Sequence, residues 1–260
     1  MNIKREKKNK TVKKVKCIFL FLILSGFISG SIFLYVRYVR SDKNSQDYSA
    51  VELPENGPED ISSIDVPPYN GEAWVELNNG MPLFSADEMT ENSFESYSEL
   101  DELGRCGTAY ANICPQIMPR EERGKIGHIK PSGWKQAKYE GIIDSVPPYL
   151  YNRCHLIAFC LAGENANEKN LITGTRYMNV NGMLPWEEKV ARYVDNTKNH
   201  VLYRVTPDFR DKELVARGVY IEAYSVEDRG TGICFFVYCY NLQPGVIIDY
   251  KTGESSLKRD

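Results

Sequence analysis

The fold is decided by residues 151–188, which read YNRCHLIAFCLAGENANEKNLITGTRYMNVNGMLPWEE. The start of this stretch predicts a β-strand at 149–159, in which alternate side chains share a face. Arg153 and His155 then point one way, and Cys154 points the other. A guanidinium beside an imidazole suits a phosphodiester, because Arg makes paired hydrogen bonds to phosphate oxygens and His accepts a proton near neutral pH. The same pair also occurs without a catalytic role, so it does not establish one alone.

The residues that follow supply candidate metal ligands. A polar loop, ENANEKN, precedes Leu-Ile-Thr and then a helix start at 175–179, capped by Thr173 or Thr175. Asn170 and Asn179 bracket that element. An asparagine carbonyl is a neutral, hard oxygen ligand, and Mg²⁺ is commonly held by few protein groups while it keeps waters and takes phosphate oxygens. Taken singly, each asparagine is more simply explained as a cap or loop residue.

The remaining pattern predicts an α+β domain. Strands are expected at residues 73–77, 82–84, 103–113, 200–205, 215–224, 233–240 and 246–250. The first two flank Asn-Asn-Gly, which is a hairpin signal. A helix is expected over 184–196, with Pro185 at its start. Its apolar face is formed by Trp186, Val190 and Val194. Several antiparallel strands with one or two helices indicate the α+β class.

Residues 1–36 indicate a membrane segment. A basic tail at 1–16 holds eight Lys or Arg, and the apolar run at 17–36 follows it. As a helix this run spans about 30 Å, the thickness of a bilayer core. It is longer than the apolar region of a signal peptide and lacks an A-x-A-like cleavage site, which favours a retained single-pass anchor over secretion after signal cleavage. The basic side then stays in the cytoplasm, and the C-terminal bulk lies outside the cell membrane.

The rest of the chain divides into a linker at 37–70 and a folded domain at 71–255. Residues 41–70 hold seven acids, one lysine and four prolines but few large apolar groups. Such a segment buries too little surface to fold, so it is expected to space the domain from the membrane.

The net charge of −3 hides an uneven distribution. Residues 41–260 carry 22 basic and 34 acidic side chains, which argues against nucleic-acid binding, because that affinity depends on neutralising phosphates. However, seven of the acids lie within 85–102, without one base. Residues 103–260 carry 21 basic and 18 acidic side chains, and six Lys or Arg fall within 120–138. The charge therefore permits a polyanionic substrate without requiring one.

The whole arrangement resembles the DNA/RNA non-specific endonuclease family of ββα-metal nucleases. The likeness is closer to the membrane-anchored bacterial nucleases that include the DNA-entry nucleases of competent cocci. It covers roughly residues 70–250 and is densest over 151–194. Beyond the opening stretch it includes the segments GRCGTAYANI, MPREERGKIGHIKPSGW and YNLQPGVIIDYKTGES.

The resemblance implies a ββα-metal nuclease fold, with a central antiparallel sheet flanked by helices. It implies that His155 is the general base and that Arg153 contacts the scissile phosphate. It also implies that Asn179 is the single direct protein ligand of Mg²⁺, with Mn²⁺ as the alternative ion. The expected reaction is hydrolysis of DNA, and also of RNA, to 5′-phosphate products. Because these contacts read the backbone, little sequence preference is expected.

Further roles follow from the same resemblance. Asn170 is the supporting asparagine and is expected beside the substrate. Arg176 is a candidate phosphate contact. Glu187 is expected to orient water on the metal, with Glu188 as the fallback because the register is less certain there.

The sequence departs from the family's Asp-Arg-Gly-His motif at two positions. Asn152 replaces the acid and Cys154 replaces the glycine. The acid's position lies on the strand face opposite His155, so an amide that makes the same backbone contacts should be tolerated. Cysteine adds bulk but remains small and buriable. The departures concern the fine geometry more than the class of reaction.

Other classes of function compete with this one. A structural zinc site is disfavoured because no Cys-x-x-Cys pair occurs. A Cys–His hydrolase is disfavoured because Cys154 and His155 are predicted to face opposite ways. A non-catalytic, membrane-tethered nucleic-acid receptor with the same fold is the main alternative, although a receptor has no need of a general base. Six cysteines follow residue 100, and the sequence leaves open whether they form disulfides or stay free.

Overall fold

The computed structural model describes residues 50–53 and 61–259. The predicted basic tail at 1–16 and membrane anchor at 17–36 lie outside the described residues. Within the described ranges, no helix has both the length and the apolar character needed to cross a membrane.

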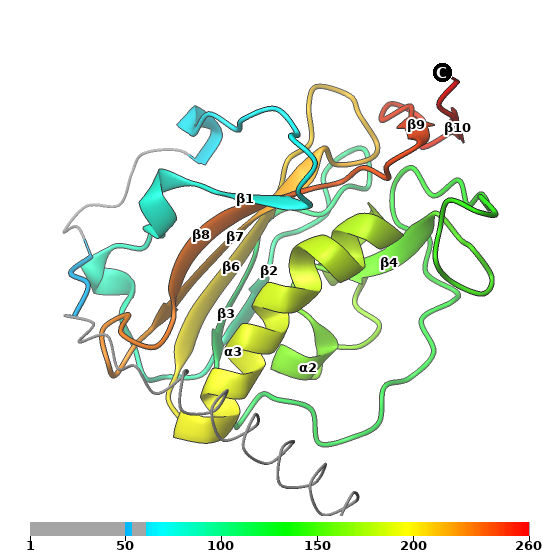
Figure 1. Ribbon diagram of the computed structural model, residues 1–260. Helices are drawn as coiled ribbons and strands as arrows, with labels where there is room; N and C mark the ends of the chain where they lie inside the picture. Colours follow the sequence, from blue (N-terminus) through cyan, green and yellow to red (C-terminus); the bar gives the residue numbers. More distant parts are fainter. Residues whose placement is uncertain (1–49, 54–60, 260) are drawn as a thin grey trace, which may run out of the picture. The chain divides into compact units, whose positions relative to one another are not determined.

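The centre of the fold is a six-stranded antiparallel sheet (Figure 1). In spatial order its strands are β1 (Trp74–Glu76), β8 (Cys234–Tyr240), β7 (Gly218–Ser225), β6 (Val201–Pro207), β3 (Ala109–Ile113) and β2 (Glu95–Tyr97). The prediction of a central antiparallel sheet in an α+β domain is confirmed. The three longest strands are central because their apolar residues are buried on both sides of the sheet.

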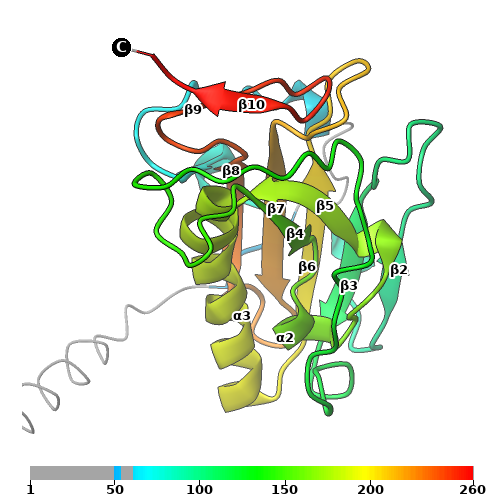
Figure 2. The ribbon, with the colours of Figure 1, turned by 90° about the vertical axis from the view of Figure 1, so that its right-hand side faces the viewer.

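Both faces of the sheet are covered, and β7 shows how. Its residues Val219 and Ile221 belong to one hydrophobic cluster, whereas Tyr220 and Tyr224 belong to two clusters on the opposite face. This alternation follows the two-residue period of a strand. The helices α2 (Phe159–Ala162) and α3 (Leu184–Thr197) cover the first face, together with the hairpin described below (Figure 2).

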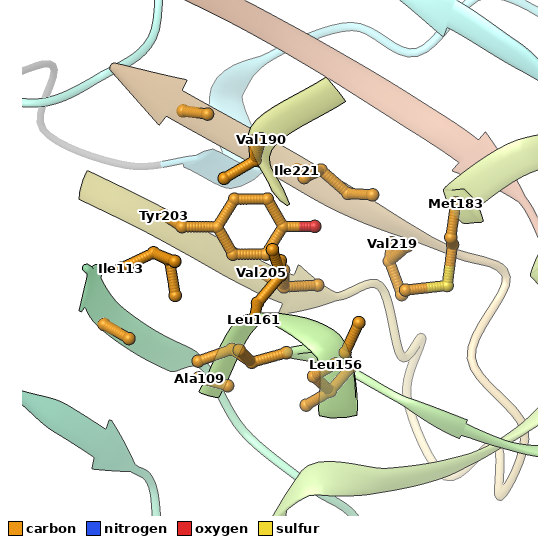
Figure 3. Close-up of a cluster of buried hydrophobic side chains, with 14 of the residues drawn as sticks. Ala109, Ile113, Leu156, Leu161, Met183, Val190, Tyr203, Val205, Val219 and Ile221 are labelled. Atoms are coloured by element: carbon orange, nitrogen blue, oxygen red, sulfur yellow. The ribbon is translucent and has the colours of Figure 1, made fainter. Parts of the chain in front are cut away.

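The main core lies between α3 and the sheet. Val190 and Val194 of α3 are fully buried, and Val190 lies above Tyr203 and Ile221 in Figure 3. Burial of each such aliphatic side chain stabilises the fold by roughly 1.5–3 kcal/mol. The predicted helix at 184–196 is confirmed, and its predicted inward face is correct. Trp186 is half-buried and packs edge-on against the ring of Trp74.

A separate hairpin holds the opening stretch of sequence. Strand β4 (Tyr151–His155) pairs antiparallel with β5 (Leu171–Thr175). The Thr175 hydroxyl then accepts a hydrogen bond from the Met178 amide at 3.0 Å, which caps the helix that follows. That helix passes through a π-helical segment, Met178–Met183, directly into α3. The order β4, β5, helix is the ββα unit that the resemblance implied.

Two details of this unit differ from expectation. The residues Leu-Ile-Thr before the helix are strand β5, so Thr173 pairs with Arg153 and does not cap a helix. Residues 176–197 form one continuous helical run, where a helix start and a separate second helix were predicted. A π-helical turn absorbs one extra residue without ending the helix, which sequence periodicity does not reveal.

The predicted hairpin around Asn-Asn-Gly is wrong. β1 pairs with β8, more than 150 residues later in the chain, and residues 82–84 form no strand. The Leu83 amide instead donates to the buried Glu222 carboxylate at 2.6 Å. The remaining elements are the hairpin of β9 (Val246–Ile248) with β10 (Ser255–Leu257) and the 3-10 helices Ile61–Ser63, Asn78–Gly80, Ala86–Glu88 and Glu168–Asn170.

Residues before the predicted domain start at 71 also contact the sheet. Ile61, Ile64 and Val66 pack against a hydrophobic cluster of the sheet, and the Tyr240 hydroxyl donates to the Pro67 carbonyl at 2.6 Å. Val51 is held by the backbone of the folded unit. These apolar residues are few, but they cover a sheet face that would otherwise be exposed.

The six described cysteines are free thiols, and Cys154 explains one departure from the family motif. Its side chain is fully buried and lies against Gly174, near the Met178 methyl group. A Cβ atom at position 174 would overlap the Cys154 sulfur and would lie 2.6 Å from Met178 Cε. The missing side chain of Gly174 therefore makes room for the sulfur of Cys154.

This packing predicts a coupled pair of substitutions. Gly174→Ala should lower the free energy of unfolding by about 1–3 kcal/mol, the usual cost of overpacking a core. Chemical denaturation of the single variants and of Gly174→Ala with Cys154→Ala measures the coupling. We expect the double variant to be more stable than the sum of the two single losses predicts, and strictly additive losses would contradict this account.

Candidate active site

A hollow of about 670 Å³ opens beside β4 and the start of the helical run. It is lined by Arg123, Ile126, Trp134, Gln136, Tyr149, Tyr151, Asn152, Arg153, Arg176 and Asn179. Three of the predicted site residues, Arg153, Arg176 and Asn179, therefore meet in one place. His155 adjoins the hollow through Arg123, with which it shares a hydrogen bond.

His155 is held in a single tautomer. Its side chain is buried, and its Nε2 lies 2.9 Å from the backbone carbonyl of Asn165. A carbonyl only accepts, so Nε2 carries the proton and Nδ1 carries the lone pair. Nδ1 accepts a hydrogen bond from the Arg123 guanidinium at 3.2 Å. Burial lowers the pKa of His155, the Asn165 carbonyl opposes this shift, and the charge of Arg123 adds to it. The imidazole is therefore a neutral base near pH 7.

Arg123 is the functional candidate that sequence reasoning did not single out. It contacts His155 and lines the hollow. Its charge also reaches Glu187, where it partly opposes the rise in pKa that burial causes. The only signal in the sequence is the run of six basic residues within 120–138. Nothing in that run distinguishes Arg123 from its neighbours, because the contact with His155 is made across 32 residues of chain.

Arg153 is engaged by a neighbouring loop. Its guanidinium donates to the carbonyls of Ile129 and, at 2.8 Å, of Gly127, and it lies 4.1 Å from the centre of the Trp134 ring. A guanidinium has five N–H donors, so these contacts leave others for a phosphate. Arg153 thus fastens the loop that follows Arg123 to strand β4.

Asn179 is half-buried on the π-helical segment and lines the hollow together with Asn152. Among the described residues, no group of three or more His, Cys, Asp or Glu side chains could hold a metal ion. The amide oxygens of these two residues fit a hard divalent cation that keeps most of its waters and takes oxygens from a phosphate. The π-helical turn is a feature often found at functional sites.

Glu187 and Glu188 are clearly separated by the structure. Glu187 is buried, and burial raises its pKa to about 8, opposed by Arg123 and supported by Glu188. Glu188 is exposed and pairs with Arg192 at 3.2 Å, one turn along α3. Of the two carboxyls, the buried one that the charge of Arg123 reaches is thus that of Glu187.

Asn170 corrects a prediction. Its side chain has no exposed surface, so it does not bind substrate. Its side-chain amide instead binds the backbone of Ile157, two residues after the end of β4. It accepts from the Ile157 amide at 2.8 Å and donates to the Ile157 carbonyl at 3.0 Å. Asn170 supports the site by fixing the chain just beyond His155.

Comparisons with known proteins find similar sequences and structures. A model of the DNA/RNA non-specific endonuclease family matches residues 85–227. Crystal structures of NucA from Streptococcus agalactiae are similar at 27% identity over 76% of this chain and 92% of theirs, with TM-scores of 0.63 without metal and 0.64 with magnesium bound. The structure of the Sda1 nuclease with bound zinc is similar at 29% identity over 64% of this chain and 81% of that one, with a TM-score of 0.53.

A curated relative gives a shorter match. A deoxyribonuclease of Streptococcus dysgalactiae subsp. equisimilis is 35% identical over 112 residues, which are 40% of this chain. The matched part is 32% of the length of that protein.

The different roles of the two asparagines can be separated by stability. Asn170→Ala leaves the Ile157 amide and carbonyl buried without partners, so it should cost about 1–3 kcal/mol. Asn179→Ala removes a half-buried amide at the hollow and should change stability by less than about 0.5 kcal/mol. Thermal unfolding of both variants tests this, and equal losses would contradict the assigned roles.

Glu187 predicts a pH dependence of stability. Its pKa is raised from 4.5 to about 8 in the folded chain. The neutral carboxyl is therefore favoured by folding, and the stability that it contributes is present below pH 4.5 and lost as the pH rises through about 8. Glu187→Gln should flatten the decline in free energy of unfolding across this window, by up to about 1.4 kcal/mol per pH unit. Glu188→Gln, an exposed neighbour, is the control and should keep the wild-type slope.

Proposed function

The chain belongs to the DNA/RNA non-specific endonuclease family, and from this premise we propose that it is a metal-dependent endonuclease. Its substrates are DNA and RNA, and it hydrolyses their phosphodiester bonds with little sequence preference. The observation that carries the proposal is the buried His155, held in one tautomer with Nδ1 directed at an arginine of the hollow. This is the arrangement that a general base beside a phosphate requires.

The proton is taken by His155 Nδ1. Its lone pair accepts from Arg123 in this structure, so Arg123 must turn toward the substrate before water can replace it. A phosphate is a stronger partner for a guanidinium than a neutral imidazole, because the bond is assisted by both charges. Substrate binding therefore frees the base. The Nε2–H of His155 keeps its hydrogen bond to the Asn165 carbonyl, and this carbonyl stabilises the imidazolium that forms when Nδ1 takes the proton.

The arginines of the hollow hold the phosphate. Arg123, Arg153 and Arg176 line it, and none of its lining residues is acidic. Arg153 contributes from a fixed position because the Gly127 and Ile129 carbonyls hold its guanidinium. Contacts to phosphates position the nucleic-acid backbone and carry no sequence information, which supports broad specificity.

Asn179 would hold the cation, and Asn152 lines the same hollow. When bound, Mg²⁺, or Mn²⁺ as the alternative, supplies Lewis acidity to the phosphate and stabilises the leaving 3′-oxygen. The similar structures support a divalent cation, since one NucA structure has magnesium bound and the Sda1 structure has zinc bound. Burial favours the neutral form of the Glu187 carboxyl, whereas the charge of Arg123 or of a nearby cation favours its charged form. The charged carboxylate can hold a water molecule by accepting hydrogen bonds from it.

The location is proposed from the sequence of residues 1–36. A basic tail followed by a long apolar run supports a single-pass membrane anchor, with the nuclease domain on the outer side. Secretion after signal cleavage is the alternative. An outer location suits uptake or scavenging of nucleic acid better than repair inside the cell.

A non-catalytic nucleic-acid receptor is the alternative function. It shares the arginine-lined hollow but needs neither a fixed tautomer of His155 nor the buried Glu187. The two functions differ in turnover, and a cleavage assay distinguishes them.

The full chain should cleave plasmid DNA and RNA with Mg²⁺ and should lose this activity in EDTA. His155→Ala should lower the rate by about 10²–10⁴-fold, the usual contribution of a general base. Asn179→Ala should raise the Mg²⁺ concentration needed for half-maximal rate. Gel analysis of both substrates measures these effects, with Asn199→Ala, on the loop after α3, as the control. Cleavage that persists in EDTA or in His155→Ala would contradict the mechanism. Salt-dependent binding without cleavage would favour the non-catalytic receptor.

A further inference from the structure

The hollow is larger than the reacting groups require. Six waters around a cation occupy about 180 Å³ at ~30 Å³ each, whereas the hollow measures about 670 Å³. Its lining runs from Arg153 of β4 back to Tyr149, whereas His155 is not one of its lining residues. What lines this far end determines which other part of the substrate it can hold.

Tyr149 is the exposed aromatic residue of the lining, with the Lys138 ammonium over one side of its ring. The face of Trp134 is covered by the Arg153 guanidinium, 4.1 Å from the ring centre. Tyr151 is 1% exposed, and its hydroxyl donates to the Gly253 carbonyl. Tyr149, in contrast, is 39% exposed. An exposed aromatic ring at the edge of a basic hollow is the feature on which nucleobases stack.

Hydrogen bonds fix the backbone that carries Tyr149 before any ligand arrives. Tyr149 forms an isolated β-bridge with Lys138, and the neighbouring Leu150 amide donates to the Ala137 carbonyl at 2.9 Å. The Tyr139 amide donates to the Pro148 carbonyl at 3.1 Å. A rigid platform loses little conformational entropy when a base stacks on it.

The charges around the ring favour a polyanion. The Lys138 ammonium lies 5.1 Å from the centre of the Tyr149 ring, where it can also reach a phosphate. Arg153 and Arg176 line the same hollow. A base on the ring would thus have its backbone phosphates among three cations.

We infer that Tyr149 and Lys138 form a nucleotide subsite that stacks one unpaired base of the substrate, away from the cut. The inference rests on the proposed function and deepens it. Tyr149 lies two residues before β4, along which His155 is about 13 Å from Tyr151 at ~3.3 Å per residue of strand. The stacked base therefore belongs to a nucleotide further along the strand than the one that is cut. Because a paired base is stacked inside a duplex, this subsite works on single-stranded DNA or RNA and on unpaired ends.

An abasic position provides the test. The full chain digests an end-labelled single-stranded oligonucleotide that carries one abasic position, and the same oligonucleotide intact, and the cut positions are compared. Wild type should cut several-fold less at one phosphate, at a fixed offset from the missing base. Tyr149→Phe keeps the ring and should keep this dip, whereas Tyr149→Leu should remove it and raise KM for single strands by about tenfold, within the range of one stacked base.

The controls make each outcome decisive. Tyr69→Leu removes another exposed tyrosine, 37% exposed and outside the hollow, and should keep the dip. Thermal unfolding shows whether each variant is folded. A wild-type pattern that ignores the abasic position, or a dip that persists in Tyr149→Leu, would overturn the subsite while leaving the nuclease intact. No cleavage of either oligonucleotide or of plasmid would overturn the proposed function, and the subsite with it.

Discussion

The imidazole of His155 is fixed by one hydrogen bond, from Nε2 to the backbone carbonyl of Asn165 at 2.9 Å. That carbonyl lies on a loop, so the site depends on how firmly the loop is held. Gly124 approaches the Asn165 amide so closely that a Cβ there would lie 2.7 Å from its nitrogen. At the far end of the loop, Asn170 clamps Ile157 through both its amide and its carbonyl. The close approach of Gly124 on one side and the bonded amide of Asn170 on the other therefore hold the loop whose carbonyl sets the proton position of this ring.

The same burial sets the charges of the acid and the base. Loss of solvent lowers the pKa of His155 and raises that of Glu187, because it disfavours the charged form of each group. The hollow itself carries arginines and, among its lining residues, no acid. Such a site holds a cation weakly alone and more firmly with a phosphate, because the substrate supplies both the oxygen ligands and the missing negative charge. Arg123 connects the base to the hollow, since it donates to His155 Nδ1 at 3.2 Å and also lines the hollow.

Short sequence patterns predicted the helices and strands that are determined by neighbouring residues. Pro185 and the spacing of Val190 and Val194 are sufficient to place α3, and the long apolar runs are sufficient to place β6, β7 and β8. The contacts made across long stretches of chain were beyond such reasoning. β1 joins β8 rather than its neighbour, and Arg123 reaches His155 from a loop whose basic residues look alike in sequence. Asn170 was assigned to substrate because sequence shows that an amide is present and not whether its atoms are already bonded.

The distribution of acids shows why overall charge is a poor guide to substrate for this chain. Much of the acidic segment at 85–102 lies on and around β2, the edge strand of the main sheet. Asp101 pairs with Arg105 and Glu99 with Lys169, whereas Glu88 pairs with Arg204 of the inner strand β6. Charge on an edge strand also prevents another chain from pairing with it. The acids thus serve the sheet edge, whereas the residues that line the hollow are neutral or basic. It is this local field, rather than the sum over the chain, that an approaching phosphate meets.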